Sequence, residues 1–249
     1  MDMLGLEIGN IILSMLSIAI GGFLRGFLGF GAALVIVPAL SIVLPPVTAI
    51  AVLVIIEIPT ILYLVPTNFR DASRATLVPM MIGLIIAVPI GTALLVAIDP
   101  SRMKLAISVV LLLTVGLLAS GWRIKGKIGN GALASSGLIG GFIQGAAGMG
   151  GPPLVTALMS LPDNAQVARA NIIMALSTMS LTNFFFLVFY GKVSVDVLSF
   201  GLFGAPVYVF ANWVGARFFK QHGNRHFRHA ALFALATIAV LTIHSNLPV

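Results

Sequence analysis

The sequence predicts an all-α polytopic membrane protein. Of its 249 residues, 59% are hydrophobic and only 8% are charged, and the mean hydropathy is +1.11. A soluble domain carries about 25% charged residues, so this chain has too few polar side chains to cover a water-facing surface. Its apolar runs reach or approach the roughly 20 residues that a helix needs to cross the hydrocarbon core. The runs are continuous rather than alternating, which favours helices over a β-barrel.

Five apolar segments precede residue 121. Each ends at a proline, a glycine-rich stretch or charged residues, which interrupt or end a membrane helix. They cover 8–24, ending in a glycine-rich stretch; 27–44, ending at Pro45-Pro46; 49–65, ending at Pro66-Thr67-Asn68; 76–98, ending at Asp99-Pro100; and 103–120, ending before the basic stretch 122–127.

Five more segments follow the basic stretch. They cover 131–145, ending in a second glycine-rich stretch; 148–161, which carries Gly150-Gly151-Pro152-Pro153 near its start; 168–190, the most polar of the ten; 195–219; and 229–243. Segment 27–44 is long enough to cross, whereas 148–161 is short. If both are re-entrant, about eight segments span the membrane; if both cross, about ten do.

The distribution of lysine and arginine favours ten crossings. With ten, and with Arg25 left aside, ten basic residues lie on one side of the membrane and three on the other. The ten are Arg70, Arg74, Arg123, Lys125, Lys127, Arg169, Arg217, Lys220, Arg225 and Arg228, and the three are Arg102, Lys104 and Lys192. With eight crossings the same residues divide six against seven. Because cytoplasmic loops carry the excess of positive charge, we expect ten crossings of the cytoplasmic membrane with both termini outside.

Ten crossings give five to each half of the chain, and an odd number inverts the second half relative to the first. We therefore expect a first transmembrane repeat at 1–121, a cytoplasmic linker at 122–128 and a second transmembrane repeat at 129–249. Inverted repeats with broken helices are typical of secondary transporters.

A glycine-rich stretch at 21–31 returns 119 residues later at 140–150. In register, five glycines and one phenylalanine match, and Arg25 falls opposite Gln144. A glycine-broken apolar segment in each half of a membrane chain is the best sequence indication of a transporter's binding site. The alternative is that the small-xxx-small spacing in both copies only lets helices pack closely. The two roles are compatible.

Arg25 is the strongest candidate for binding an anion. An arginine inside an apolar run costs at least about 2.5 kcal/mol if it faces lipid, and its planar guanidinium pairs with carboxylate, sulfonate or phosphate oxygens. Helices that begin near 29–32 and 150–153 would point their positive N-terminal ends at the same place. The alternative is that Arg25 snorkels to the interface. The substrate-binding candidates are Arg25, Gly26, Gly29, Gly31, Gln144, Gly145, Gly148, Gly150, Pro152 and Asn171.

Glu57 is the acidic residue that lies well inside an apolar run. Intramembrane carboxyl groups are functional candidates, so we expect Glu57 to carry a coupling proton or to pair with Arg25. The alternative is a structural carboxyl group bonded to a neighbouring helix. Gln144 and Asn171 are expected to form hydrogen bonds with the substrate; for Gln144 the alternative is an ordinary interhelical hydrogen bond.

The sequence indicates neither an enzyme nor a metal protein. It contains no cysteine, no nucleophile–base pair and no phosphate-binding loop, so we expect no catalytic residue, no cofactor and no ATP-driven pump. The first three of the histidines His222, His226, His229 and His244 lie in a basic loop without nearby carboxylates. That loop suits anionic lipid, and no metal is expected. Membrane orientation, rather than nucleic acid, accounts for the net charge of +7.

At these glycine motifs the chain resembles the sulfite exporter TauE/SafE family of membrane proteins. The resemblance rests on the stretch 22–31 followed by Pro38, on its second copy at 141–153, and on the size and the duplicated halves. Leu28 stands where many members have a second small residue, so the local pocket shape is expected to differ. The resemblance implies transport, without ATP, of small and often sulfur-containing anions: sulfite, thiosulfate, sulfoacetate and related organosulfonates or carboxylates.

We therefore expect a secondary transporter, with export as one direction, that moves a small organic or inorganic anion by alternating access. An anion channel or facilitator without ion coupling is the alternative, since it would use the same residues. The expected partners are the small anion and the lipid bilayer, while proton coupling and a homodimer stay open.

Overall fold

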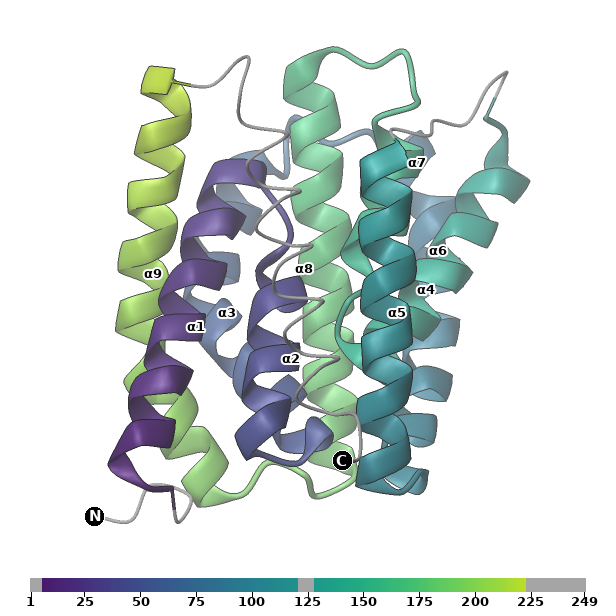
Figure 1. Ribbon diagram of the computed structural model, residues 1–249. Coiled ribbons are helices and arrows are strands. Elements are labelled where there is room, and N and C mark those ends of the chain that lie inside the picture. The colour runs from purple at the N-terminus through teal and green to yellow at the C-terminus, as the bar shows by residue number, and fades with distance from the viewer. Residues whose placement is uncertain (1–5, 121–127, 223–249) are drawn as a thin grey trace.

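The computed structural model describes residues 6–120 and 128–222, which form helices joined by short connections and contain no strand (Figure 1). The helices are α1 (Ile8–Leu28), α2 (Ala32–Val43), α3 (Pro46–Asn68), α4 (Arg74–Ala97), α5 (Pro100–Ser120), α6 (Asn130–Ala147), α7 (Gly151–Leu158), α8 (Ala165–Phe189) and α9 (Val195–His222). The segment expected at 229–243, and all but the last residue of the expected linker 122–128, lie outside the described residues.

Within the described ranges, six helices are long and apolar enough to cross a membrane: α1, α3, α4, α5, α8 and α9. Their outward faces carry large apolar side chains, and Ile82, Ile86 and Ile90 of α4 are each more than half exposed (56%, 54% and 57%). An apolar surface of this extent is stable against lipid rather than water. The chain is therefore a multi-pass, all-α membrane protein, as the composition predicts.

Two helices are shorter than a membrane crossing requires. α2 has 12 residues and α7 has 8, against the roughly 20 that the hydrocarbon core demands. In Figure 1, α1 rises from the lower end and α2 returns toward it, whereas α6 descends from the upper end and α7 returns upward. The hairpins α1–α2 and α6–α7 thus open toward opposite ends of the molecule.

The helix breaks are shorter than the sequence predicts. The segments expected to end at 24 and 145 continue as helix to Leu28 and Ala147. The chain leaves the helix only around Gly29 and Gly31, with φ of 81° and 97°, and around Gly148, with φ of 70°. Glycine adopts these left-handed conformations without the penalty that a Cβ brings.

The earlier glycines stay helical because a neighbouring helix packs directly against them. A Cβ on Gly26 of α1 would collide with the carbonyl oxygen of Asn212 in α9, and one on Gly145 of α6 would collide with that of Val88 in α4. Small residues of this kind let helix backbones approach closely in a membrane. The packing alternative considered for the glycine-rich stretches therefore describes these positions well.

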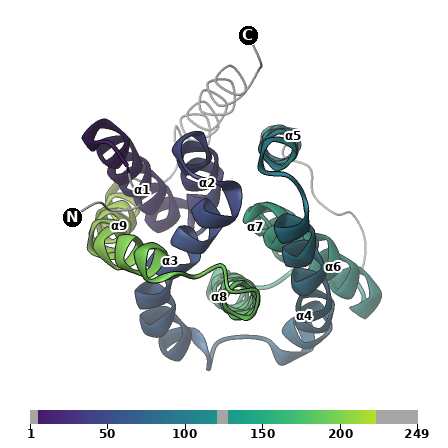
Figure 2. The same ribbon diagram turned by 90° about the horizontal axis from the view of Figure 1, so that it is seen from below.

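α3 runs through the interior of the described bundle. Every residue from 49 to 57 is buried, which is the pattern of a helix covered on all sides. Figure 2 shows α8 between a group formed by α1, α2, α3 and α9 and a group formed by α4, α5, α6 and α7. Glu57 closes the buried stretch of α3, on the side where that helix meets α8 and α9.

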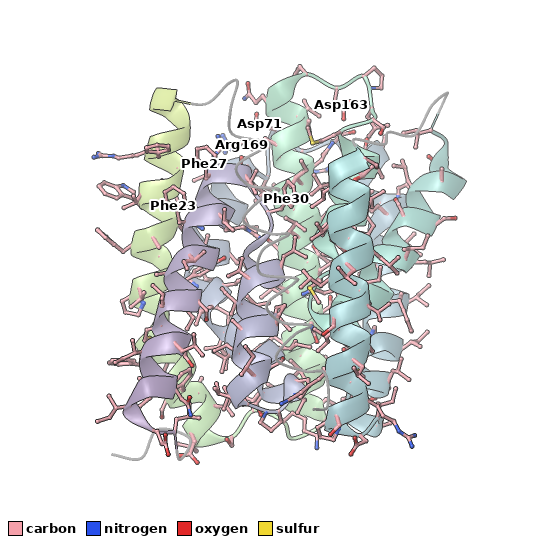
Figure 3. All side chains as sticks on the ribbon, viewed as in Figure 1. Phe23, Phe27, Phe30, Asp71, Asp163 and Arg169 are labelled. Atoms are coloured by element: carbon pink, nitrogen blue, oxygen red, sulfur yellow. The ribbon has the colours of Figure 1, made fainter. Side chains whose placement is uncertain are left out.

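Charged side chains gather at the ends of the bundle. Figure 3 places Asp71, Asp163 and Arg169 at the upper end, beside the connections between α3 and α4 and between α7 and α8. Among the charged residues of the described ranges, Arg25 and Glu57 differ because their side chains lie inside the bundle, only 11% and 5% exposed.

Candidate functional site

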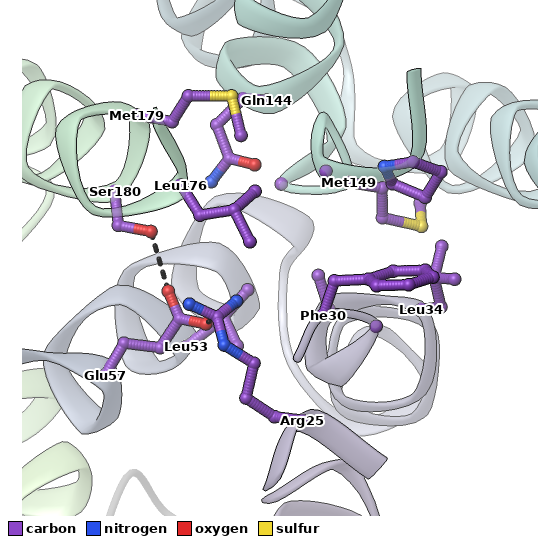
Figure 4. A pocket seen from close by; sticks show the side chains of 15 residues that line it. Arg25, Phe30, Leu34, Leu53, Glu57, Gln144, Met149, Leu176, Met179 and Ser180 are labelled. Atoms are coloured by element: carbon purple, nitrogen blue, oxygen red, sulfur yellow. Dashed lines mark hydrogen bonds and ion pairs between the residues drawn. The ribbon is translucent and has the colours of Figure 1, made fainter. Parts of the chain in front are cut away.

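Arg25 lies in the last turn of α1, where the helix ends at a left-handed glycine. The N–H of Gly29 donates to the carbonyl oxygen of Arg25 at 2.7 Å, which is a common way for a helix to end. Gly31 then precedes α2. The chain reversal leaves the Arg25 side chain pointing away from α1 toward Glu57 (Figure 4).

Gln144 occupies the same place at the second break. The N–H of Gly148 donates to the Gln144 carbonyl oxygen at 2.8 Å, just as Gly29 donates to Arg25. The Gln144 side chain also closes the turn, since its Oε1 accepts a 3.1 Å hydrogen bond from the N–H of Gly150. A backbone N–H is only a donor, so the amide oxygen must face Gly150. The Nε2 group then faces the opposite way, toward the interior (Figure 4).

One pocket lies between the two breaks. It is lined from both breaks and from α3 and α8 by Arg25, Phe30, Gly31, Ala33, Leu34, Leu53, Glu57, Gln144, Gly148, Met149, Gly151, Pro152, Leu176, Met179 and Ser180. Its free volume is about 20 Å³, which is room for about one water molecule. The pocket is therefore too narrow for an oxyanion of several heavy atoms.

Glu57 joins α3 to three other helices at this pocket. Its Oε1 lies 3.4 Å from Nη1 of Arg25 and accepts a 3.3 Å hydrogen bond from the hydroxyl of Tyr208. Its Oε2 accepts a 2.6 Å hydrogen bond from Oγ of Ser180. The Arg25 and Glu57 side chains are only 11% and 5% exposed. A carboxylate removed from water needs a counter-ion and hydrogen-bond donors, and these three residues supply both.

Hydrogen-bond donors are left over on both sides of the pocket. Among the residues that the structure describes, Arg25 pairs with Glu57 alone, and Nε2 of Gln144 has no acceptor. The other walls are apolar, with Phe30, Met149 and Met179 among them. The guanidinium N–H groups that Glu57 does not use, together with the amide N–H groups of Gln144, suit a small anion in an apolar surrounding.

The ten residues that the sequence suggests for substrate binding divide evenly. Those that line the pocket are Arg25, Gly31, Gln144, Gly148 and Pro152, and Glu57 joins them. Those that lie outside its lining are Gly26, Gly29, Gly145, Gly150 and Asn171. The structure therefore brings together residues from both glycine-rich stretches, and it gives several of the glycines a packing or turn-forming position instead.

Asn171 has a different environment from the one expected. It is fully buried near the start of α8. Its Oδ1 accepts a 2.8 Å hydrogen bond from the N–H of Ser73, and its Nδ2 donates to Oδ2 of Asp163 at 3.2 Å. Both ends of the amide are thus used: one bonds to the connection between α3 and α4, and the other to the connection between α7 and α8.

Sequence reasoning missed Ser180 and Tyr208 as members of the site. The unusual polarity of segment 168–190 pointed to α8 without singling out Ser180. Tyr208 is one of three tyrosines and lies within an apolar run, and a buried tyrosine hydroxyl needs a hydrogen-bond partner. That need could have paired it with Glu57, the intramembrane carboxylate.

Comparison with known proteins finds similarity over most of the chain. A family model described as sulfite exporter TauE/SafE matches residues 14–242, a range that includes both breaks and the pocket. A relative from Cupriavidus necator, named "Probable sulfite/organosulfonate exporter TauE", is 23% identical over 206 residues, which cover 80% of each of the two chains. No solved structure matches this chain.

Proposed function

The chain belongs to the sulfite exporter TauE/SafE family, and we propose that it is a secondary transporter of a small organic or inorganic anion of the sulfite or organosulfonate type. The relative from Cupriavidus necator bears an exporter's name, which favours export from the cytoplasm. The observation that carries the proposal is the Arg25 guanidinium, which lines the pocket and keeps hydrogen-bond donors that Glu57 does not use.

In this proposal Arg25 and Gln144 bind the anion from opposite breaks. The guanidinium supplies charge-assisted hydrogen bonds to oxygens of the anion, and Nε2 of Gln144 supplies a neutral donor from the other side. The N–H groups at the start of α2, which begins at Ala32 beside the pocket residue Gly31, add the positive end of a helix dipole. Glycine at the breaks lets the anion approach the backbone closely.

The two halves of the chain act in this proposal as inverted repeats. Two matching contacts support the relation. A Cβ on Gly91 of α4 would collide with the carbonyl oxygen of Phe142 in α6, and one on Gly215 of α9 would collide with that of Phe23 in α1. Phe23 and Phe142 are the phenylalanines that match in the repeated glycine-rich stretches. The pairs α1–α9 and α6–α4 therefore pack in the same way, which is expected of two structural repeats.

Alternating access follows from that relation. A site at the interface of two repeats opens to either side as one repeat rocks against the other. The narrow pocket, with room for about one water molecule, corresponds to a state without a bound anion. In this proposal the upper end of Figure 1, where the basic residues of the α3–α4 connection and of α8 lie, faces the cytoplasm, and the start of α1 faces the outside.

Glu57 carries the coupling proton in this proposal. It is a buried carboxylate that contacts the same guanidinium as the anion would. Binding of the anion to Arg25 therefore changes how readily Glu57 takes up a proton. An uncoupled anion channel would use the same residues, but a pocket with room for only about one water molecule must widen to admit an anion, which favours a carrier.

Counterflow in proteoliposomes tests the transporter. Vesicles preloaded with unlabelled sulfite should accumulate external radiolabelled sulfite transiently above equilibrium, which a carrier produces and a channel does not. Arg25→Gln should abolish the overshoot. Arg102→Gln, at an exposed arginine near the start of α5, is the matched control and should retain it. Wild-type flux without counterflow would support the channel, and an intact overshoot in Arg25→Gln would overturn the assigned site.

A further inference from the structure

The charges around the pocket balance one another. Among its lining residues, Arg25 and Glu57 are the charged ones, so the pocket carries no net charge when both are ionised. Tyr208 of α9 and Ser180 of α8 face Glu57 as hydroxyls. α2, which also packs against α3, has no titratable residue.

The remaining neighbours of α3 place their charges elsewhere. Arg102 and Lys104 of α5 lie near the start of that helix, and Arg74 is the first residue of α4. The start of α5 is at the lower end and the start of α4 at the upper end of the bundle in Figure 1, whereas Glu57 is in the middle of α3. Among the residues that the structure describes, Arg25 is therefore the cation that balances Glu57.

An anion bound to Arg25 would break that balance. Arg25 would then share its positive charge between the anion and Glu57, at a place almost closed to water. Two negative charges facing one cation in such a site are unfavourable. Uptake of a proton by Glu57 removes the second negative charge, and the pocket with its anion is again neutral.

Ser180 and Tyr208 allow Glu57 to stay in place in both states. They bond to different oxygens of the carboxyl group, at 2.6 Å and 3.3 Å. A hydroxyl donates to a carboxylate and also accepts from a carboxylic acid. The pair can therefore hold ionised Glu57 before the anion arrives and protonated Glu57 afterwards, without a rearrangement of α3.

We propose that the transporter carries a singly charged anion together with one proton on Glu57, as an electrically neutral unit. This inference rests on the proposed function and adds the substrate's charge and the coupling ratio. The favoured substrates are monoanions such as hydrogensulfite and alkylsulfonates. A dianion bound with the same single proton would leave the pocket negative, so thiosulfate and fully ionised sulfite should be poorer substrates.

The ratio of protons to anions in wild-type proteoliposomes tests this directly. Radiolabelled methanesulfonate, a monoanion, serves as the probe, and an entrapped pH dye reports protons, while potassium and valinomycin set the membrane potential. We expect one proton to enter with each anion and the anion's equilibrium accumulation to be independent of the potential. For a single unpaired charge, about 100 mV would change that accumulation by about 50-fold. Accumulation that follows the potential, with no acidification, would overturn the neutral unit while leaving the transporter intact.

Two outcomes keep this test separate from that of the function itself. Sulfite counterflow together with a proton ratio near zero overturns only the coupling, whereas the absence of both sulfite and methanesulfonate flux overturns the proposed function and the coupling with it. Glu57→Gln should lower the proton-to-anion ratio of any remaining flux to near zero. Asp196→Asn, at an exposed carboxylate of α9, is the matched control and should keep the wild-type ratio.

Ser180 is assigned as a positioning residue. Ser180→Ala should shift the pH profile of methanesulfonate uptake, because Glu57 loses a hydroxyl partner, while Ser180→Thr should restore the wild-type profile. A Ser180→Ala variant with a lowered rate but an unchanged pH profile would contradict this role.

Discussion

Removing Arg25 should destabilise the protein through Glu57. Arg25→Gln takes away the cation that lies 3.4 Å from a carboxylate that is 5% exposed. Breaking a buried pair by removing one partner costs about 3–5 kcal/mol, because the other charge stays buried without a partner. In the variant, Glu57 would still line the pocket and would keep its hydrogen bonds from the hydroxyls of Ser180 and Tyr208, which reduces the cost. We therefore expect the lower end of the range, about 3 kcal/mol.

The double variant Arg25→Gln with Glu57→Gln isolates the cause. A neutral amide in place of the Glu57 carboxylate needs no cation, so the effect of Arg25→Gln should fall to about 1 kcal/mol in that background, and the coupling free energy between the two positions should be about 2 kcal/mol. The assay is equilibrium unfolding of the four proteins in mixed micelles with increasing sodium dodecyl sulfate. Arg102→Gln serves as the surface control and should change the free energy of unfolding by less than about 0.5 kcal/mol. An equal effect of Arg25→Gln in both backgrounds would refute the buried ion pair.

Contacts outside that pair give three further predictions. Gly26→Ala should lower the free energy of unfolding by about 1–3 kcal/mol because its Cβ meets the backbone of α9, whereas Gly116→Ala in α5 meets nothing and should be neutral or stabilising; equal effects would contradict the close approach. Gln144→Glu keeps an acceptor for the Gly150 N–H but replaces the donor that faces the pocket with a negative charge, so titration calorimetry should show sulfite affinity lowered at least about tenfold, and unchanged affinity would remove Gln144 from the site. Asn171→Ala should cost about 1–3 kcal/mol of stability by leaving buried groups unpaired yet keep the wild-type sulfite affinity, and a selective loss of affinity would return Asn171 to the binding residues.

The sequence allowed the membrane class and the presence of two glycine-rich helix breaks to be predicted. Composition alone required apolar helices, and the repeated glycine-rich stretch identified the two breaks that line the pocket. Arg25 and Glu57 stood out because charge is expensive inside an apolar run. Pairing with Arg25 had been one of three interpretations of Glu57, and the structure shows the ion pair.

The exact position of each break was harder to predict. Glycine permits both a helix and a left-handed turn, so the sequence of 21–31 does not say which of its glycines turns the chain. The contact of α9 with Gly26, which comes from a residue distant in sequence, keeps that position helical and moves the break to 29–31.

Hydroxyl and amide partners could not be assigned from sequence for a related reason. Ser180 and Asn171 both belong to the polar α8 helix, but one faces the pocket and the other faces the connection between α3 and α4. The difference depends on how α8 is rotated against its neighbours. Tertiary packing fixes that rotation, whereas the weak amphipathic pattern of a buried membrane helix does not.

The binding of sulfite to the Arg25→Gln variant tests the central claim most directly, since the whole account places the transported anion on this guanidinium. Isothermal titration of purified wild-type protein, Arg25→Gln and the control Arg102→Gln measures the dissociation constant without relying on transport. Loss of a hydrogen bond to a charged group is worth about 1.5–3 kcal/mol, which corresponds to a weakening of roughly 10- to 150-fold. We predict that loss for Arg25→Gln and wild-type affinity for Arg102→Gln. A folded Arg25→Gln protein that binds sulfite as tightly as the wild type would contradict the account.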